Sequence, residues 1–204
     1  MNRAVLSSTQ RCRAAPLAAF ATALLPAPAL LALHFRDGPP AQVTGGFGGD
    51  SCIACHSGNA LNDDAGQLTL QEFPERYTPG TTYDFELTLS RPPAIAAAGF
   101  QLAVRLADST QAGSILVPAE DQARIALLDE RGVRYAHHRL VEPAPPASGT
   151  VRWKLSWTAP EAVGEIFVHA AAVAGDGDES QLGDHVYTLE ATATLAGASD
   201  PRVE

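Results

Sequence analysis

The sequence predicts an all-β fold, an antiparallel sandwich or barrel, from about residue 65 onwards. Apolar and polar residues alternate in four runs, at 83–89, 100–106, 151–157 and 187–195. Glycine and proline clusters lie between the runs, and no stretch in this region keeps a 3.6-residue period. About eight or nine short strands separated by turns are typical of such a fold.

Five shorter segments complete the expected strands. They cover residues 66–71, 113–117, 124–128, 133–137 and 165–174. Turn signals separate them from the longer runs, among them Pro79-Gly80, Arg131-Gly132 and Gly175-Asp176-Gly177. The predicted β domain therefore spans residues 65–195, and residues 196–204 form a C-terminal tail.

Composition limits the protein to a small set of classes. With 204 residues, of which 46% are hydrophobic, the chain can build one ordinary core with appendages. Its net charge is −9, and residues 1–33 contain three arginines and no acid, so their removal would give −12. This charge argues against nucleic-acid binding, which needs cations that neutralise phosphates, and it is compatible with a basic or polar protein partner.

The N-terminus has the pattern of an export signal. Arg3, Arg11 and Arg13 precede an apolar, uncharged stretch at 15–33, and Ala27-Pro28-Ala29 fits a cleavage site with small residues. We expect residues 1–33 to be a signal peptide or an N-terminal anchor, and the rest of the chain to be extracytoplasmic, either periplasmic or secreted. Membrane attachment is expected only if this segment is retained.

Residues 34–64 are expected to hold a linker followed by a cofactor motif. The linker, 34–49, contains Pro39-Pro40 and a cluster of four glycines at 45–49. Cys52-Ile53-Ala54-Cys55-His56 then has the form C-x-x-C-H, which is typical of covalent c-type haem attachment. On one helical turn Cys52 and Cys55 share a face, so both reach the haem vinyl groups, and His56 follows as the proximal iron ligand. The glycines before the motif would let the backbone pass close to the porphyrin.

Two other interpretations of the cysteines were weighed. A Cys52–Cys55 disulfide or redox pair usually accompanies a βαβ unit, which the sequence lacks. A structural zinc site needs four ligands, and after loss of Cys12 with the signal segment only scattered histidines could complete it. We therefore expect one covalent haem c.

The second axial ligand is open on the residues alone. The chain has no methionine besides Met1, and Lys154 is isolated. The remaining candidates are His34, His137, His138, His169 and His185. His137 and His138 are the most suggestive, because adjacent residues of a strand point to opposite faces and one of them can face a docked haem. Ligation by two histidines would give a lower potential than His/Met ligation.

The chain resembles bacterial reeler-like proteins of the choice-of-anchor V type that carry an N-terminal C-x-x-C-H motif. The resemblance runs through GGFGGDSCIACHSG at 45–58, the Tyr77-Thr78-Pro79-Gly80 turn, Gly99-Phe100-Gln101-Leu102, Tyr135 to His138, Trp153 with Trp157-Thr158-Ala159-Pro160, and Gly183-Asp184 with Tyr187. It implies an immunoglobulin-like, reeler-type antiparallel β-sandwich with a short N-terminal haem-binding segment. It also favours His138 over His137 as the distal ligand.

Other polar clusters have plainer interpretations. Asp176, Asp178, Glu179 and Asp184 could supply oxygens to calcium, but their spacing does not fit an EF-hand loop and a polar turn is the better account. Asp63 and Asp64 are expected to solvate a loop. Trp153 and Trp157 lie on one face of a predicted strand, and we expect both in the core.

The expected function is electron transfer by a monohaem c-type cytochrome-like protein with His56 and His138 on the iron, acting with a redox partner protein outside the cytoplasm. The alternative is an extracellular binding or adhesion module, in which the haem is structural or sensory, or in which a disulfide or metal clip occupies the C-x-x-C. An enzyme such as a peroxidase would need an open iron position, so an enzymatic role is the less favoured expectation.

Overall fold

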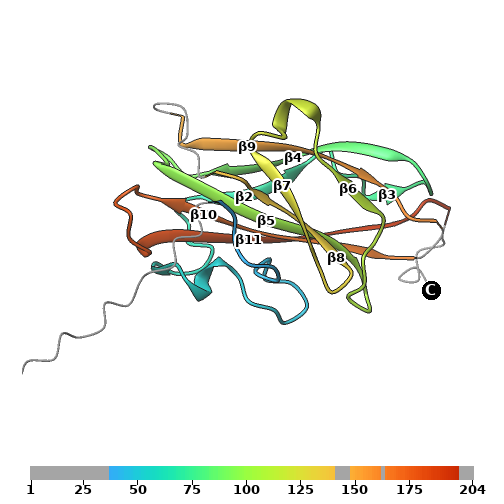
Figure 1. Cartoon of the computed structure of the whole chain (residues 1–204), viewed down its shortest axis with the longest axis horizontal. Helices are drawn as coiled ribbons and strands as arrows, with labels where there is room; N and C mark the ends of the chain where they lie inside the picture. Colours follow the sequence, from blue (N-terminus) through green and yellow to red (C-terminus); the bar gives the residue numbers. More distant parts are fainter. Residues whose placement is uncertain (1–36, 141–147, 162–163, 198–204) are drawn as a thin grey trace, which may run out of the picture. The chain divides into compact units, whose positions relative to one another are not determined.

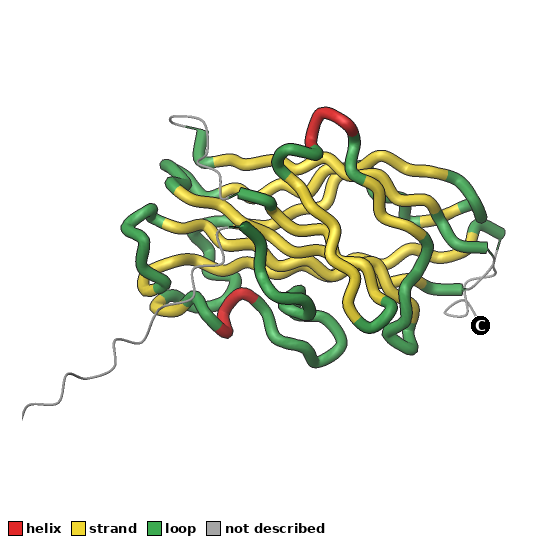
Figure 2. The backbone as a smooth tube through the Cα atoms, viewed as in Figure 1, coloured by secondary structure: helices red, strands yellow, loops and turns green. Residues whose placement is uncertain are grey.

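The computed structural model describes residues 37–140, 148–161 and 164–197 of the chain. Within them the polypeptide forms two β-sheets that pack face to face (Figures 1 and 2). The predicted signal segment, 1–33, and most of the C-terminal tail lie outside these residues. No helix in the described part of the chain is long and apolar enough to cross a membrane.

The larger sheet has seven strands. Its order is β1 (Ser57–Gly58), β11 (Leu182–Leu195), β10 (Ile166–Gly175), β5 (Ala97–Leu106), β8 (Val133–His138) and β7 (Ile125–Glu130), and β3 (Arg76–Tyr77) pairs with the far end of β11. The short pairings of β1 and β3 with β11 are parallel, and the others are antiparallel.

The smaller sheet has four antiparallel strands. Its order is β2 (Gln67–Gln71), β4 (Thr82–Ser90), β9 (Thr150–Thr158) and β6 (Ser114–Leu116). Two single turns of 3-10 helix, η1 (Cys52–Ala54) and η2 (Ala119–Asp121), are the helical elements of the described chain. The predicted all-β sandwich is therefore confirmed.

The core lies between the two sheets and follows the period-two pattern. Phe100, Leu102 and Val104 of β5 face it across from Trp153 and Leu155 of β9, and all five are fully buried. The Trp153 ring lies 4.6 Å from the Phe100 ring, and the Trp157 indole N–H donates to the Ala112 carbonyl at 2.8 Å. Both tryptophans are thus core residues, as expected.

All nine predicted strands are present, and their predicted ends differ from the observed ones by at most five residues. The two that the pattern did not predict are β1 and β3, each of two residues. A strand this short contains too few residues to show any alternation, and both are formed by pairing with β11 rather than by a sequence signal of their own.

Residues 37–49, predicted to be part of a linker, pack across the outer face of β5, β10 and β11 (Figure 1). The Gln101 side chain accepts from the Val43 amide at 2.8 Å and donates to the Pro40 carbonyl at 2.8 Å. Phe47 lies under the Arg105 guanidinium, 4.5 Å from ring centroid to Cζ, and against the His169 ring. The polar outer face of β5 and β10 is buried by this segment.

The glycines of this segment serve that packing. A Cβ at Gly46 would lie 2.2 Å from the His169 ring, and one at Gly45 would lie 3.2 Å from Thr188. Both therefore allow a close approach of backbone to sheet. This packing is a role that the sequence did not predict for them.

Candidate functional site

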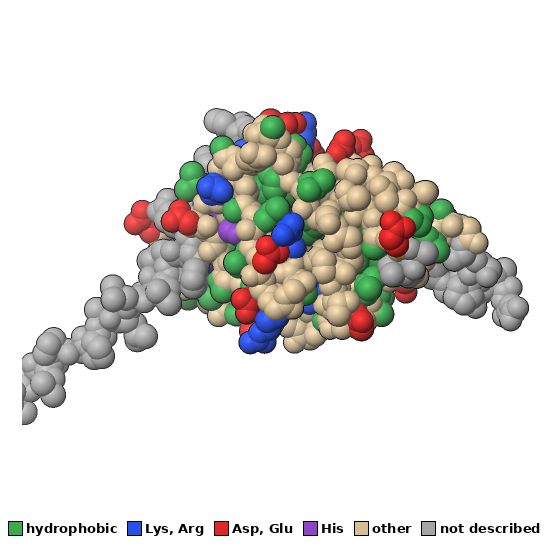
Figure 3. Space-filling model, turned by 45° about the vertical axis from the view of Figure 1, so that its right-hand side comes forward, with side chains coloured by type: hydrophobic (Ala, Val, Ile, Leu, Met, Phe, Trp, Pro, Cys, Tyr) green, Lys and Arg blue, Asp and Glu red, His purple; other side chains and the backbone are tan. Residues whose placement is uncertain are grey.

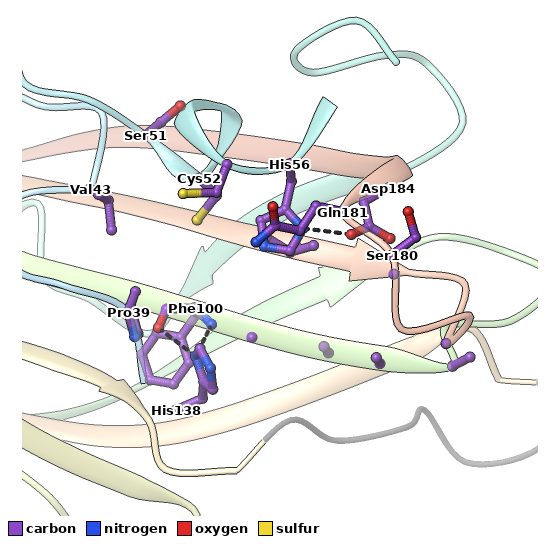
Figure 4. A pocket seen from close by; sticks show the side chains of 18 of the residues that line it. Pro39, Val43, Ser51, Cys52, His56, Phe100, His138, Ser180, Gln181 and Asp184 are labelled. Carbon is purple, nitrogen blue, oxygen red and sulfur yellow. Dashed lines mark hydrogen bonds and ion pairs between the residues drawn. The ribbon is translucent and has the colours of Figure 1, made fainter. Parts of the chain in front are cut away.

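A pocket of about 320 Å³ lies on the outer face of the seven-stranded sheet, close to η1. Its floor is the start of β5 and the end of β10, where the outward-facing residues are small: Ala97, Gly99, Val173 and Gly175. The segment at 39–56 and the turn at 177–184 supply the walls (Figure 4). Small residues on the floor leave a shallow apolar surface under the pocket.

Both cysteines of the motif line the pocket on η1. The Ser51 side chain caps this turn by accepting from the Ile53 amide at 3.4 Å. The two thiols are free, and no disulfide joins them. Cys55 is exposed. Burial of the Cys52 thiol raises the pKa of Cys52 to about 12.

His56 lies in the same wall and is held by Asp184. Its Nδ1 is 2.5 Å from Asp184 Oδ2, and the Asp184 side chain is almost fully buried. A carboxylate can only accept a hydrogen bond, so the ring donates from Nδ1, and in the neutral ring Nε2 then carries the lone pair. This is the tautomer in which a histidine binds a metal through Nε2.

Local backbone pairing brings these two residues together. β1 runs parallel to the start of β11, with Ser57 opposite Leu182 and Gly58 opposite Asp184. A Cβ at Gly58 would lie 2.8 Å from the Gly183 nitrogen, so only glycine permits this approach. The Asn59 amide adds bonds to the Gly183 and Asp184 carbonyls at 2.7 and 3.2 Å.

His138, at the end of β8, lies on the side of the pocket away from Cys52 and His56 (Figure 4). Its Nδ1 is 3.0 Å from the Phe100 nitrogen and 3.2 Å from the Phe100 oxygen, so either tautomer has a backbone partner. A Cβ at Gly99 would lie 2.7 Å from the ring. The ring therefore occupies the space that a side chain at Gly99 would fill.

The other candidate ligands lie away from the pocket wall. His137 is directed to the His138 carbonyl at 2.7 Å, and His169 pairs with Glu190 at 2.8 Å. Lys154 lies on β9 in the other sheet, opposite Glu86. His34 lies outside the described residues.

His185 is enclosed in a separate polar network. Its Nδ1 pairs with Asp63 Oδ2, and Arg91 donates to its Nε2 at 2.7 Å. Tyr187 donates to the second oxygen of Asp63 at 2.9 Å. Burial alone would raise the pKa of Asp63, but the hydrogen bonds from His185 and Tyr187 outweigh it and lower that pKa. The pKa of Tyr187 rises to about 12 through burial and the Asp63 charge.

Two expectations about acidic residues change here. Asp63 does not merely solvate its loop, because it anchors two side chains of β11. Asp184 is not part of a turn cluster, because it binds His56, while Asp176 and Asp178 accept from backbone amides two residues ahead. Among the residues described, no three or more His, Cys, Asp or Glu side chains gather as a metal-binding group.

Comparison with known proteins bears on the fold. No family model matches the sequence, and no curated protein matches it. The chain is similar to the solved Reelin-N domain of F-spondin, with a TM-score of 0.51 and 18% identity over 71% of this chain and 94% of that domain. The fold is reeler-like. A human F-spondin reeler domain gives a TM-score of 0.49 and 17% identity, covering 67% of this chain and 94% of that one.

Sequence reasoning missed two residues that shape the pocket. Asp184 lies 128 residues from His56 along the chain, and no local pattern links them. Gly99 was noted as part of a motif, but its role depends on a ring that arrives from β8. The Gly183-Asp184 pair before the last strand was the one available signal for the first of these.

Proposed function

We propose that the protein is an extracytoplasmic monohaem c-type electron-transfer protein. The observation that carries the proposal is that Cys52, Cys55, His56 and His138, chosen from the sequence, all line one pocket. These residues come from two segments about eighty positions apart, and of the five histidines that the structure describes only His56 and His138 line this pocket.

In this proposal each residue has a defined task. Cys52 and Cys55 would hold the haem covalently, and His56 would bind the iron through Nε2 while Asp184 accepts from its Nδ1–H. His138 would supply a second nitrogen ligand through Nε2, with its Nδ1–H donating to the Phe100 carbonyl. A bound haem would supply reversible one-electron chemistry.

Three features of the pocket fit such a group. The thiols are free rather than paired. The floor of Ala97, Gly99 and Val173 is apolar and has small side chains, which leaves room for a ring against the sheet. A buried carboxylate on the Nδ1 of a ligand histidine is the usual outer partner of a metal-bound imidazole.

The surface supports a protein partner rather than a nucleic acid. The chain carries a net charge of −9. On the face shown in Figure 3, the basic side chains of the described residues are scattered among acidic ones and form no continuous track. We propose a redox partner with a basic or polar contact surface, met in the periplasm or outside the cell after export directed by residues 1–33.

The first experiment is expression with a c-type haem maturation system, followed by intact-mass measurement and a pyridine-haemochrome spectrum. One covalent haem per chain is expected. The matched control is the Cys52→Ser, Cys55→Ser double variant, which keeps the fold and should carry none. A colourless wild-type protein of apo mass would contradict the proposal and leave a binding module with a reeler-like fold.

The distal ligand has its own pair of variants. His138→Ala should convert a low-spin spectrum to a high-spin one, because one axial ligand is lost. His137→Ala is the matched control, since His137 is adjacent and equally buried yet directed away from the pocket. An unchanged spectrum in His138→Ala, or the same change in both variants, would exclude His138 as the distal ligand.

A further inference from the structure

We infer that Asp184 is a positioning residue of this site, which fixes His56 in its iron-binding tautomer and lowers the reduction potential of the iron that His56 ligates. The inference rests on the proposed function, because it concerns the same pocket. It adds a residue that the haem motif does not contain and that lies 128 positions away along the chain.

The contact is built into the fold rather than being a surface ion pair. Asp184 has 5% of its side chain exposed, and its Oδ2 lies 2.5 Å from His56 Nδ1. The backbones on both sides are fixed by the parallel β1–β11 pairing and by the two Asn59 hydrogen bonds. A buried, charge-assisted hydrogen bond of this length is strong and directional. The ring can therefore neither flip nor change tautomer without breaking it.

The opposite strand leaves room for the carboxylate. A Cβ at Gly175 would lie 3.0 Å from Asp184 Oδ1, closer than ordinary packing allows. Glycine at the end of β10 thus permits the second oxygen to sit against the strand. Gly175 therefore makes room for the Asp184 carboxylate, as Gly99 makes room for the His138 ring.

The pocket lining contains no lysine or arginine to neutralise the charge of Asp184. The charged or ionisable lining residues are the two cysteines, His56, His138, Glu179 and Asp184, and no Lys or Arg is among those that line it. A buried negative charge that is poorly screened favours the more positively charged state of a nearby ion. For iron this is the ferric state, so the carboxylate lowers the potential.

The test uses the full holoprotein and the variant Asp184→Asn, which keeps shape and removes charge. We expect the oxidised-to-reduced ratio at a fixed applied potential to fall at least tenfold. For a one-electron couple this is a rise of about 59 mV or more in the midpoint potential. The EPR g values of the ferric haem should shift as well, because the donor strength of His56 changes. Asp184→Glu should restore most of both values.

Glu190→Gln is the matched control. It removes one carboxylate from the same strand, and that carboxylate also pairs with a histidine, His169, outside the pocket. A potential in Asp184→Asn that equals wild type, or that moves no more than in Glu190→Gln, would overturn the inference. If Asp184→Asn fails to fold, Asp184→Glu becomes the test. A wild-type potential in Asp184→Glu supports the inference. A shifted potential with unchanged EPR g values in that variant contradicts it. Failure of the proposed function is a different result, since wild-type protein would then carry no haem.

Discussion

Two neighbouring residues of β11, Asp184 and His185, each form a histidine–carboxylate pair, on opposite faces of the strand. Asp184 points outward to His56, which follows the cysteine motif. His185 points inward to Asp63, on the face that Tyr187 shares with the core. Each pair uses the histidine Nδ1, so that contact alone does not distinguish them.

The second ring nitrogen separates the two pairs. His185 Nε2 receives a hydrogen bond from Arg91 at 2.7 Å, so both nitrogens are committed to protein groups. His56 instead lines a pocket beside two free thiols. Hydrogen bonds on both ring nitrogens fix His185 as a structural residue. The hydrogen bond on Nδ1 alone orients His56 so that its Nε2 can bind a ligand. The comparison therefore predicts different consequences for the two histidines.

His56→Ala gives the largest expected effect. Without the proximal nitrogen, the yield of covalent haem should fall by more than about tenfold, since loss of even an outer partner commonly costs that much in metal affinity. The yield is measured by haemochrome absorbance per chain. Full haem loading of this variant would show that His56 is no ligand.

Gly99→Ala tests the opposite wall. The backbone at Gly99 is not in the left-handed region, so the change adds only a Cβ, which would lie 2.7 Å from the His138 ring. We expect the ring to be displaced and the low-spin spectrum to become largely high-spin, while cooperative thermal unfolding persists. A wild-type spectrum would mean that the ring moves without losing the iron, or never bound it.

His185→Ala is expected to act on stability alone. The substitution leaves Asp63 and Arg91 without their shared partner, which should lower the free energy of unfolding by about 2 kcal/mol. Urea denaturation measures this loss, and haem content per folded chain should equal wild type. Loss of haem with unchanged stability would reverse the assignment of the two pairs.

The smallest expected effect is a loss of unfolding free energy at acid pH, caused by protonation of Asp63. Its pKa in the folded protein lies below its ordinary value of 3.8. The stabilisation is therefore complete above about pH 3.8 and is lost as pH falls through the lower folded value. Asp63→Asn should flatten the dependence of unfolding free energy on pH in that acid range, as measured by denaturation at a series of pH values. An unaltered pH slope would contradict this.

Local pattern was enough to predict the strands but not the contacts between distant segments. Runs such as 83–89 and 151–157 carry the period-two signal of half-buried strands, so β4 and β9 followed directly. The docking of residues 37–49 could not be predicted. The residues it covers, Gln101, Arg105 and His169, are polar, so the sequence predicts a solvent-exposed sheet face where the structure has a buried one. Composition suggested a linker where the fold has a covering segment.

The residues of the candidate site likewise fall into those that a local pattern predicts and those that only the fold brings together. The cysteine motif was readable because its chemistry lies within five residues. The proximity of His138 to the motif came from resemblance rather than from pattern, and the two carboxylates that hold histidines, Asp184 and Asp63, were assigned to turns. Their partners lie more than 120 residues away, and only the paired strands bring them together.

The half-buried Cys52 thiol has a consequence for the order of assembly. Burial raises its pKa to about 12, and the thiolate is the reactive form. If a haem is attached to both cysteines as proposed, we expect the attachment to precede the docking of residues 37–49 on the sheet, because the thiol is more open to solvent in the undocked chain.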